Sequence, residues 1–237
     1  MKKVLFGIMA LATLAFCSCK GPNVHFSRTK TTNPLAEVNR ELKGFERIEL
    51  LGSLDVKYMQ ADSFSVKVKA PLKVLGDVET RVEGDKLVVN MKKDISLFNL
   101  NGADGDDVTV YVTSPDFLGI VLKGSGDFYC KRHLDTDTLN IALKGSGDIK
   151  FEDIICDLVH VSLIGSGDIE VRKVTAQQSW LDLVGSGDIK MTFDNSGRVE
   201  SRLMGSGDIK LRGSVKENRT HVRGSGEIDT NELKIGK

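Results

Sequence analysis

Histidine, cysteine and tryptophan are scarce in this sequence, which has 4, 4 and 1 of them among 237 residues. The histidines are scattered, and none lies at ligand spacing from cysteines or carboxylates, which argues against a zinc site. None shares the register of the repeated serines described below, although an activated serine needs a base within hydrogen-bond reach. We therefore expect no metal, no other cofactor and no catalytic residues. The four histidines are His25, His133, His160 and His221.

An excess of charge of one sign is also missing. The 33 lysine and arginine residues balance 33 aspartate and glutamate residues, so the formal net charge at pH 7 is +0. Binding to nucleic acid requires a concentrated basic face, because the phosphate backbone supplies most of the affinity. We therefore expect no nucleic-acid partner.

The apolar run from Val4 to Phe16 is too short to span a membrane. Two lysines precede it and Cys17-Ser18-Cys19 follows it, which is the pattern of a secretion signal. The segment resembles a bacterial lipoprotein signal, in which Cys19 becomes the lipidated N-terminus; a plain signal peptide cleaved nearby is the alternative. We place the signal peptide at residues 1–18 and a flexible tether at 19–44. The expected protein is an outer-membrane lipoprotein of the bacterial cell envelope, attached to the membrane through its N-terminal lipid, with a periplasmic or a cell-surface orientation.

The tetrapeptide Gly-Ser-Gly-Asp occurs five times and is followed by one Gly-Ser-Gly-Glu, at spacings of 21, 20, 20, 20 and 19 residues. A unit of this length cannot bury its own apolar face and must stack on its neighbours, so the period predicts a solenoid. We call each tetrapeptide a corner, because its glycines permit a positive φ or a close approach where the chain turns. The corner glycines are Gly124, Gly126, Gly145, Gly147, Gly165, Gly167, Gly185, Gly187, Gly205, Gly207, Gly224 and Gly226.

Apolar residues recur at fixed positions around each corner. They lie four and two residues before the first glycine, and four and six residues after it, so all share one parity. Side chains of a strand alternate between its faces, so this set points into one core. Parallel crossovers are right-handed as a rule. The sequence therefore predicts an all-β fold, a single-stranded right-handed parallel β-helix with coils of about 20 residues. The two columns that are apolar in every repeat are Leu122, Leu143, Leu163, Leu183, Leu203, Val222 and Phe128, Ile149, Ile169, Ile189, Ile209, Ile228.

The same template occurs in weaker form before the first full corner. Gly52-Ser53-Leu54-Asp55 is a degenerate corner, and a loop is expected at 101–105. We assign residues 45–230 to one β-helix domain, with irregular coils at 45–117, regular coils at 118–230 and a C-terminal tail at 231–237. Other strand-like runs are 64–69, 78–82, 86–91 and 108–112.

These residues resemble the head GIN domain family, also described as putative auto-transporter adhesins of the bacterial envelope. The likeness is carried by Phe45, Ile48, Gly52 and Asp55-Val56, and then by the repeated Gly-Ser-Gly-Asp-Ile. The resemblance implies a repeat fold and a role in adhesion, and it implies no catalytic residues.

The last residue of each corner forms a column of carboxylates. Like charges about 4.8 Å apart repel each other, so something must offset them. Lys150, Lys190 and Lys210 each follow an aspartate by two residues, which favours structural neutralisation, with the aspartates also accepting N–H bonds at the corners. Calcium binding to the column is the alternative. The column consists of Asp127, Asp148, Asp168, Asp188, Asp208 and Glu227.

Two cysteines remain after the signal, Cys130 and Cys156, and they are five residues out of register. We expect buried free thiols, with a disulfide as the alternative. Trp180, the only tryptophan, has outward parity and could anchor a partner or a glycan.

Three functional hypotheses follow from these patterns. The preferred one is a non-enzymatic, lipid-anchored envelope protein, an adhesin or scaffold that binds an unknown protein or glycan partner through the β-helix surface. The alternatives are a polysaccharide-active lyase or hydrolase on a β-helix, and a calcium-binding structural repeat protein. An enzyme needs charged residues that break the repeat and converge in a groove, whereas the charge we recognise follows the repeat.

Overall fold

The computed structural model describes residues 34–92 and 108–236. The predicted signal peptide, the lipidation site Cys19 and the loop at 101–105 lie outside the described residues. Within the described part every regular element is a strand, so no helix there could cross a membrane. The strands are β1 (Leu35–Arg40), β2 (Arg47–Gly52), β3 (Asp55–Gln60), β4 (Ser65–Pro71), β5 (Val78–Glu83), β6 (Lys86–Met91), β7 (Thr109–Ser114), β8 (Gly119–Gly124), β9 (Phe128–Asp135), β10 (Thr138–Gly145), β11 (Asp148–Gly165), β12 (Asp168–Gly185), β13 (Asp188–Gly205), β14 (Asp208–Gly224) and β15 (Glu227–Ile235).

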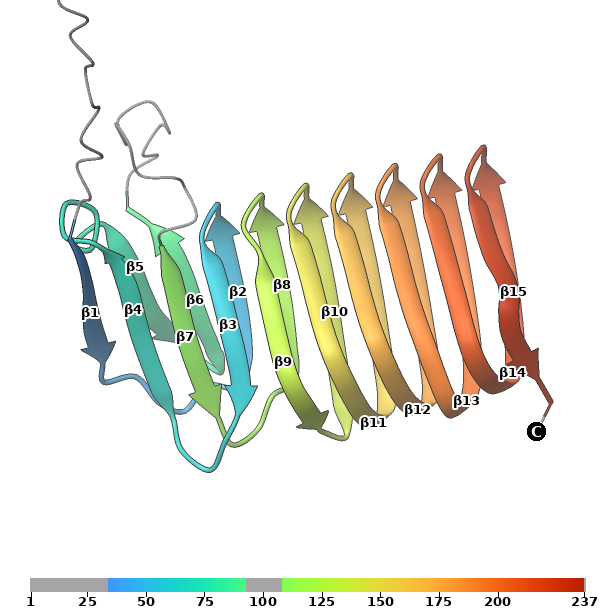
Figure 1. Cartoon of the computed structure of the whole chain (residues 1–237), viewed down its shortest axis with the longest axis horizontal. Coiled ribbons are helices and arrows are strands. Elements are labelled where there is room, and N and C mark those ends of the chain that lie inside the picture. Colours follow the sequence, from blue (N-terminus) through green and yellow to red (C-terminus); the bar gives the residue numbers. More distant parts are fainter. Residues whose placement is uncertain (1–33, 93–107, 237) are drawn as a thin grey trace, which may run out of the picture. The chain divides into compact units, whose positions relative to one another are not determined.

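The corners lie directly over one another. Strands one repeat apart pair in parallel, and Gly145, Gly165, Gly185 and Gly205 face each other in register through β10 to β13. Figure 1 shows the successive coils side by side, with their corners along one edge. The predicted solenoid of parallel coils is confirmed, whereas its handedness stays a prediction from the crossover rule. Gly52 pairs with Gly124, so the degenerate corner has the same register as the full corners.

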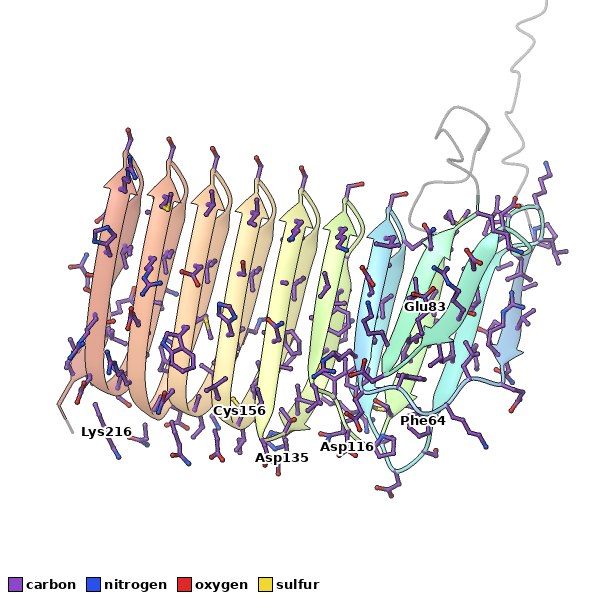
Figure 2. All side chains as sticks on the ribbon, turned by 180° about the vertical axis from the view of Figure 1, so that it is seen from behind. Phe64, Glu83, Asp116, Asp135, Cys156 and Lys216 are labelled. Carbon is purple, nitrogen blue, oxygen red and sulfur yellow. The ribbon has the colours of Figure 1, made fainter. Side chains whose placement is uncertain are left out.

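Each long strand bends twice within one coil. In β11, Glu152 and Asp153 are consecutive residues that both avoid the core, as do Asp157 and Leu158, so the inward parity changes at both places. The bends divide the coil into three sides and carry the strand around the core without breaking its pairing with β12. Figure 2 places Cys156 and Lys216 at this bent edge, opposite the corners. Three inward positions lie beyond the four predicted ones, and β11 fills them with Ile154, Cys156 and Val159.

Aromatic rings continue the core into the less regular half of the chain. The ring of Tyr58 stacks on that of Phe117 with centroids 4.1 Å apart, and Phe128 lies 5.9 Å from Phe117 and 5.4 Å from Phe151. All four residues are at most 2% exposed. A fully buried side chain of this size contributes about 2–3 kcal/mol, and the ring contacts add to that. The stack therefore joins the irregular coils to the regular ones.

The two glycines of a corner are required for different reasons. Gly165 has a φ of +138°, which only glycine adopts readily. Gly167 has no positive φ, but a Cβ there would lie 2.0 Å from the carbonyl oxygen of Gly147 in the preceding coil. The first glycine thus turns the chain, and the second allows adjacent coils to touch.

The N-terminal end of the stack departs from the coil pattern. Strands β6 and β7 still pair in parallel with β2 and β3. Beyond them β4 pairs antiparallel with β7, β1 with β4, and β5 with β6. Part of the segment expected to form irregular coils therefore consists of antiparallel strands, and residues 35–40 of the expected tether form β1. The alternating pattern predicts strands but not their direction, which hairpin and crossover geometry decide.

The C-terminal end keeps the parallel pairing to the last strand. Strand β15 pairs with β14 and includes residues 231–235, which were expected to form a tail. Three inward positions of this last coil hold the polar residues Asn218, Thr220 and Thr230, while Val222 and Ile228 keep their columns apolar. Polar residues on the outer face of a terminal repeat allow it to face water.

Candidate functional site

The carboxylate column forms a hydrogen-bonded ladder between coils. The backbone N–H of Asp148 donates to Oδ1 of Asp127 at 3.0 Å, and that of Asp188 donates to Oδ1 of Asp168 at 3.2 Å. Asp208 and Glu227 donate in the same way to the aspartate of the coil before them, at 3.3 and 3.2 Å. In four of the five steps the aspartate of one corner therefore holds the backbone of the next corner, and the N–H of Asp168 instead donates to the carbonyl oxygen of Gly147.

In three of the five column aspartates the second carboxylate oxygen bonds to a side chain within its own coil, whereas the expected pair of Lys210 with Asp208 is not formed. Nζ of Lys150 donates to Oδ2 of Asp148 at 2.8 Å, and Nζ of Lys190 lies 3.2 Å from Oδ2 of Asp188. These hydrogen bonds raise the pKa of both lysines against a smaller opposing effect of desolvation. In the first full coil the hydroxyl of Tyr129 takes the place of the lysine. Both observations favour the structural interpretation of the column over calcium binding.

A metal-binding cluster is not present among residues 34–92 and 108–236, where no three histidine, cysteine, aspartate or glutamate side chains are grouped to hold an ion. Calcium takes six to eight oxygen ligands. Each coil contributes a single column carboxylate, and three of the five aspartates also bond to a lysine or tyrosine, so the column offers no converging set of that size.

Both cysteines of the described chain are free and buried. Burial raises the pKa of the Cys130 thiol to about 11 and that of the Cys156 thiol to about 12. The expectation of buried free thiols is confirmed, and at neutral pH both are protonated and unreactive.

The outward side chains of β11, β12 and β13 form a groove next to Trp180. In the parallel register His160, Trp180 and Glu200 lie side by side on these three strands, and Asp182 is paired with Arg202 one position further along. The groove has a volume of about 340 Å³. Its lining residues are Leu158, His160, Trp180, Asp182, Glu200 and Arg202. Trp180 therefore points outward, as its parity predicted, and it has polar neighbours on both sides.

Charged side chains in the groove are paired with each other. Nε2 of His160 lies 3.1 Å from Oδ2 of Asp182. Glu200 accepts hydrogen bonds from Arg202 at 2.7 Å and from Arg198 at 3.3 Å, one on each carboxylate oxygen. Around Trp180 the two carboxylates, Asp182 and Glu200, are matched in number by two arginines, Arg202 in the groove and Arg198 next to it. The donors and acceptors of the groove are also held in place by one another.

An exposed apolar stripe runs beside the groove. Ile164, Val184 and Met204 occupy the same outward position on consecutive coils and are 45%, 42% and 48% exposed. Lys144 and Arg223 occupy this position on the coils before and after. We call the outward surface of β11–β13 that holds the stripe and the groove the recognition face.

Trp180 was predicted from the sequence as a candidate contact residue, whereas its neighbours His160, Asp182, Glu200 and Arg202 were not. The charge recognised in the sequence follows the repeat, but these residues break the repeat and converge on one groove. The available signal was that the outward positions five and three residues before a corner differ from coil to coil. Pairing between coils brings them together.

The chain is similar to a known protein family and to several solved structures. A family model described as "putative auto-transporter adhesin, head GIN domain" matches residues 44–179 and 157–237. No curated protein sequence matches the chain. A putative adhesin from Bacteroides fragilis is 22% identical, with a TM-score of 0.65 over 83% of this chain and 97% of that one. A putative lipid binding protein from Parabacteroides distasonis is 18% identical, with a TM-score of 0.64 over 87% and 98% of the two chains.

A putative adhesin from Parabacteroides distasonis is 16% identical, with a TM-score of 0.53 over 83% of this chain and 97% of that one. At these identities the solved structures establish the fold alone. The family match is broader evidence, because its two segments overlap and together extend from residue 44 to the C-terminus. The chain therefore belongs to the head GIN domain family of putative adhesins.

Proposed function

We propose that this protein is a non-enzymatic adhesin of the bacterial cell envelope, anchored by a lipid on Cys19, that binds its partner through the recognition face. The observation that carries the proposal is the break in the repeat around Trp180. Inward columns and corner aspartates recur from coil to coil because they hold the stack together. The groove residues differ from coil to coil, which stacking does not require.

Adhesion is tested with beads coated with the full chain and a panel of immobilised glycoproteins and matrix proteins. We expect bead retention that falls at least about tenfold in Trp180→Ala, because a central tryptophan commonly dominates a contact surface. Tyr111→Ala is the matched control, since Tyr111 is an exposed aromatic residue on β7, a strand that is not paired with β11–β13. Equal retention of both variants and the unmodified chain would refute the recognition face.

Lipid anchoring is tested separately, by expression in a bacterium fed a labelled fatty acid. The proposal requires label on the chain and its loss in Cys19→Ala. Protease treatment of intact cells then distinguishes a surface from a periplasmic orientation. Label retained in the variant would show that another residue carries the lipid, and an unlabelled unmodified chain would show that no residue does.

A polysaccharide-active enzyme is the second candidate, and the convergence of Asp182 and Glu200 on one groove is the observation that favours it. A glycoside hydrolase needs one carboxyl group that donates a proton to the leaving group. Both oxygens of Glu200 instead accept hydrogen bonds from arginines, and Asp182 is paired with His160. Cleavage of a polysaccharide that disappears in both Asp182→Asn and Glu200→Gln would replace the adhesin proposal with this one.

A further inference from the structure

The recognition face presents side chains to a ligand, but its backbone N–H and C=O groups are not available for hydrogen bonds to one. Strands β11, β12 and β13 are each paired on both sides, so their N–H and C=O groups are used within the sheet. An extended peptide that binds by adding a strand needs an open edge. A ligand at this place must therefore be recognised by the side chains around Trp180.

The indole of Trp180 stands between two depressions. One is the groove of about 340 Å³ on the side of His160 and Asp182. The other, of about 170 Å³, is lined by Gln178, Arg198 and Glu200 together with the ring. An apolar flat surface bordered by fixed polar groups is the usual composition of a small-molecule site.

The polar groups suit a ligand that both donates and accepts hydrogen bonds. Asp182 and Glu200 can accept further bonds, while Arg202, whose side chain is 60% exposed, has donors beyond the one that contacts Glu200. Because the two arginines and two carboxylates around Trp180 balance each other, an anionic or cationic ligand would gain no net attraction from them. A hydroxyl group both donates and accepts, and so matches a site in which the acceptors Asp182 and Glu200 lie beside the donor Arg202.

From this juxtaposition we infer that the groove binds a neutral saccharide chain, with the apolar face of a sugar ring stacked on Trp180 and its hydroxyl groups bonded to Asp182, Glu200 and Arg202. The inference rests on the proposed binding role of the recognition face and names its ligand class. The chain lies along the direction in which coils are stacked, since His160, Trp180 and Glu200 follow each other in that direction about 4.8 Å apart.

The single tryptophan gives a direct measurement, because all tryptophan fluorescence of the full chain comes from Trp180. The probes are neutral oligosaccharides of glucose, mannose, xylose and galactose, with oligogalacturonate and an acidic peptide as charged comparisons. We expect a saturable change in emission with at least one neutral oligosaccharide and none with the charged probes. No saturable change with any neutral probe, or saturation only with a charged one, would overturn the inference.

Calorimetric titration of the responding oligosaccharide tests the assignment of residues. We expect Trp180→Ala to weaken binding at least about thirtyfold, and Glu200→Gln or Asp182→Asn at least about fivefold. Tyr111→Ala should bind as the unmodified chain does. Far-ultraviolet circular dichroism shows whether each variant is folded, and Trp180→Phe keeps a ring in place and should retain part of the affinity. Unchanged affinity in folded Trp180→Ala would overturn the inference.

The bead experiment separates this inference from the proposed function. If Trp180→Ala abolishes adhesion while no neutral oligosaccharide binds, the recognition face stands and its ligand is not a saccharide. If a neutral oligosaccharide binds in the groove while adhesion is unchanged in Trp180→Ala, the saccharide site stands and the adhesin role fails.

Discussion

Substitution of Gly187 by alanine tests the close contact between coils separately from the need of a corner glycine for a positive φ. Gly187 is the second glycine of its corner, is buried and has no positive φ. Alanine could therefore adopt the backbone conformation of Gly187. The site has no space for the alanine side chain, however, because the added Cβ would lie 2.0 Å from the carbonyl oxygen of Gly167.

The magnitude follows from the hydrogen bonds around that contact. Since Cβ atoms essentially never come within 3.0 Å of another heavy atom, the two coils must separate by about 1 Å at this corner. Three backbone hydrogen bonds join the corner to the preceding coil, from the N–H groups of Ser186, Gly187 and Asp188, at 2.9, 3.2 and 3.3 Å. That separation takes them out of bonding range, and at about 1 kcal/mol each the loss is about 3 kcal/mol.

The assay is urea unfolding followed by circular dichroism, with the thermal midpoint as a second measurement. For a domain of this size 3 kcal/mol corresponds to a decrease in Tm of about 6–12 °C. Gly76→Ala is the matched control, because Gly76 has no positive φ and nothing within 4 Å of an added Cβ. It should change stability by less than about 1 kcal/mol. A Gly187→Ala chain within about 0.5 kcal/mol of the unmodified chain would refute the contact argument.

Three further perturbations have defined outcomes. Asp188→Ala removes the acceptor of the next coil's N–H and the partner of a lysine, and should lower the unfolding free energy by about 1–2 kcal/mol in urea titrations; a neutral result would exclude the ladder as a source of stability. Glu49 accepts hydrogen bonds from two lysines, which hold its pKa below the usual value. The carboxylate therefore stabilises the folded chain fully above the pKa that Glu49 has in the unfolded chain, and this stabilisation is lost as the pH falls through the lower pKa of the folded chain. Glu49→Gln should therefore lose less stability than the unmodified chain between pH 7 and pH 3, and equal losses would contradict this. Cys130 and Cys156 should react with a thiol reagent only in denaturant, and rapid labelling of the native chain would show that they are accessible.

The regular coils could be predicted in detail because stacking makes their sequence repeat. Leu163 and Ile169 have counterparts in every coil. Residues that share a column in the alignment of the repeats are the residues that pair between neighbouring coils. The bends were not predicted, because Ile154 and Cys156 follow a change of parity that the corner alignment does not contain. Strands β4 and β5 were predicted as strands, and β1 was assigned to the tether. Their antiparallel direction was not predicted, because the connections between strands decide it and the alternating pattern does not contain them.

The candidate site could be predicted only in part, for the opposite reason. Trp180 was recognised from its outward parity, which is a local property of the strand. His160 and Glu200 lie 20 residues before and after it in the sequence and border it only because adjacent coils are paired. Because the groove residues differ from coil to coil, they form no recurring column in an alignment of the repeats. Residues that serve stacking are therefore visible in the sequence, and residues that serve recognition become visible in the fold.

The identical corners have a consequence for how such a protein can change its length. Since each corner bonds to the one before it in the same way, a whole 20-residue unit inserted before β11 would join both of its neighbours without a new kind of contact. It would move the Trp180 surface about 4.8 Å further from the N-terminal end and leave that surface unaltered. Reach and specificity can thus evolve separately, one by duplication of units and the other by point substitution.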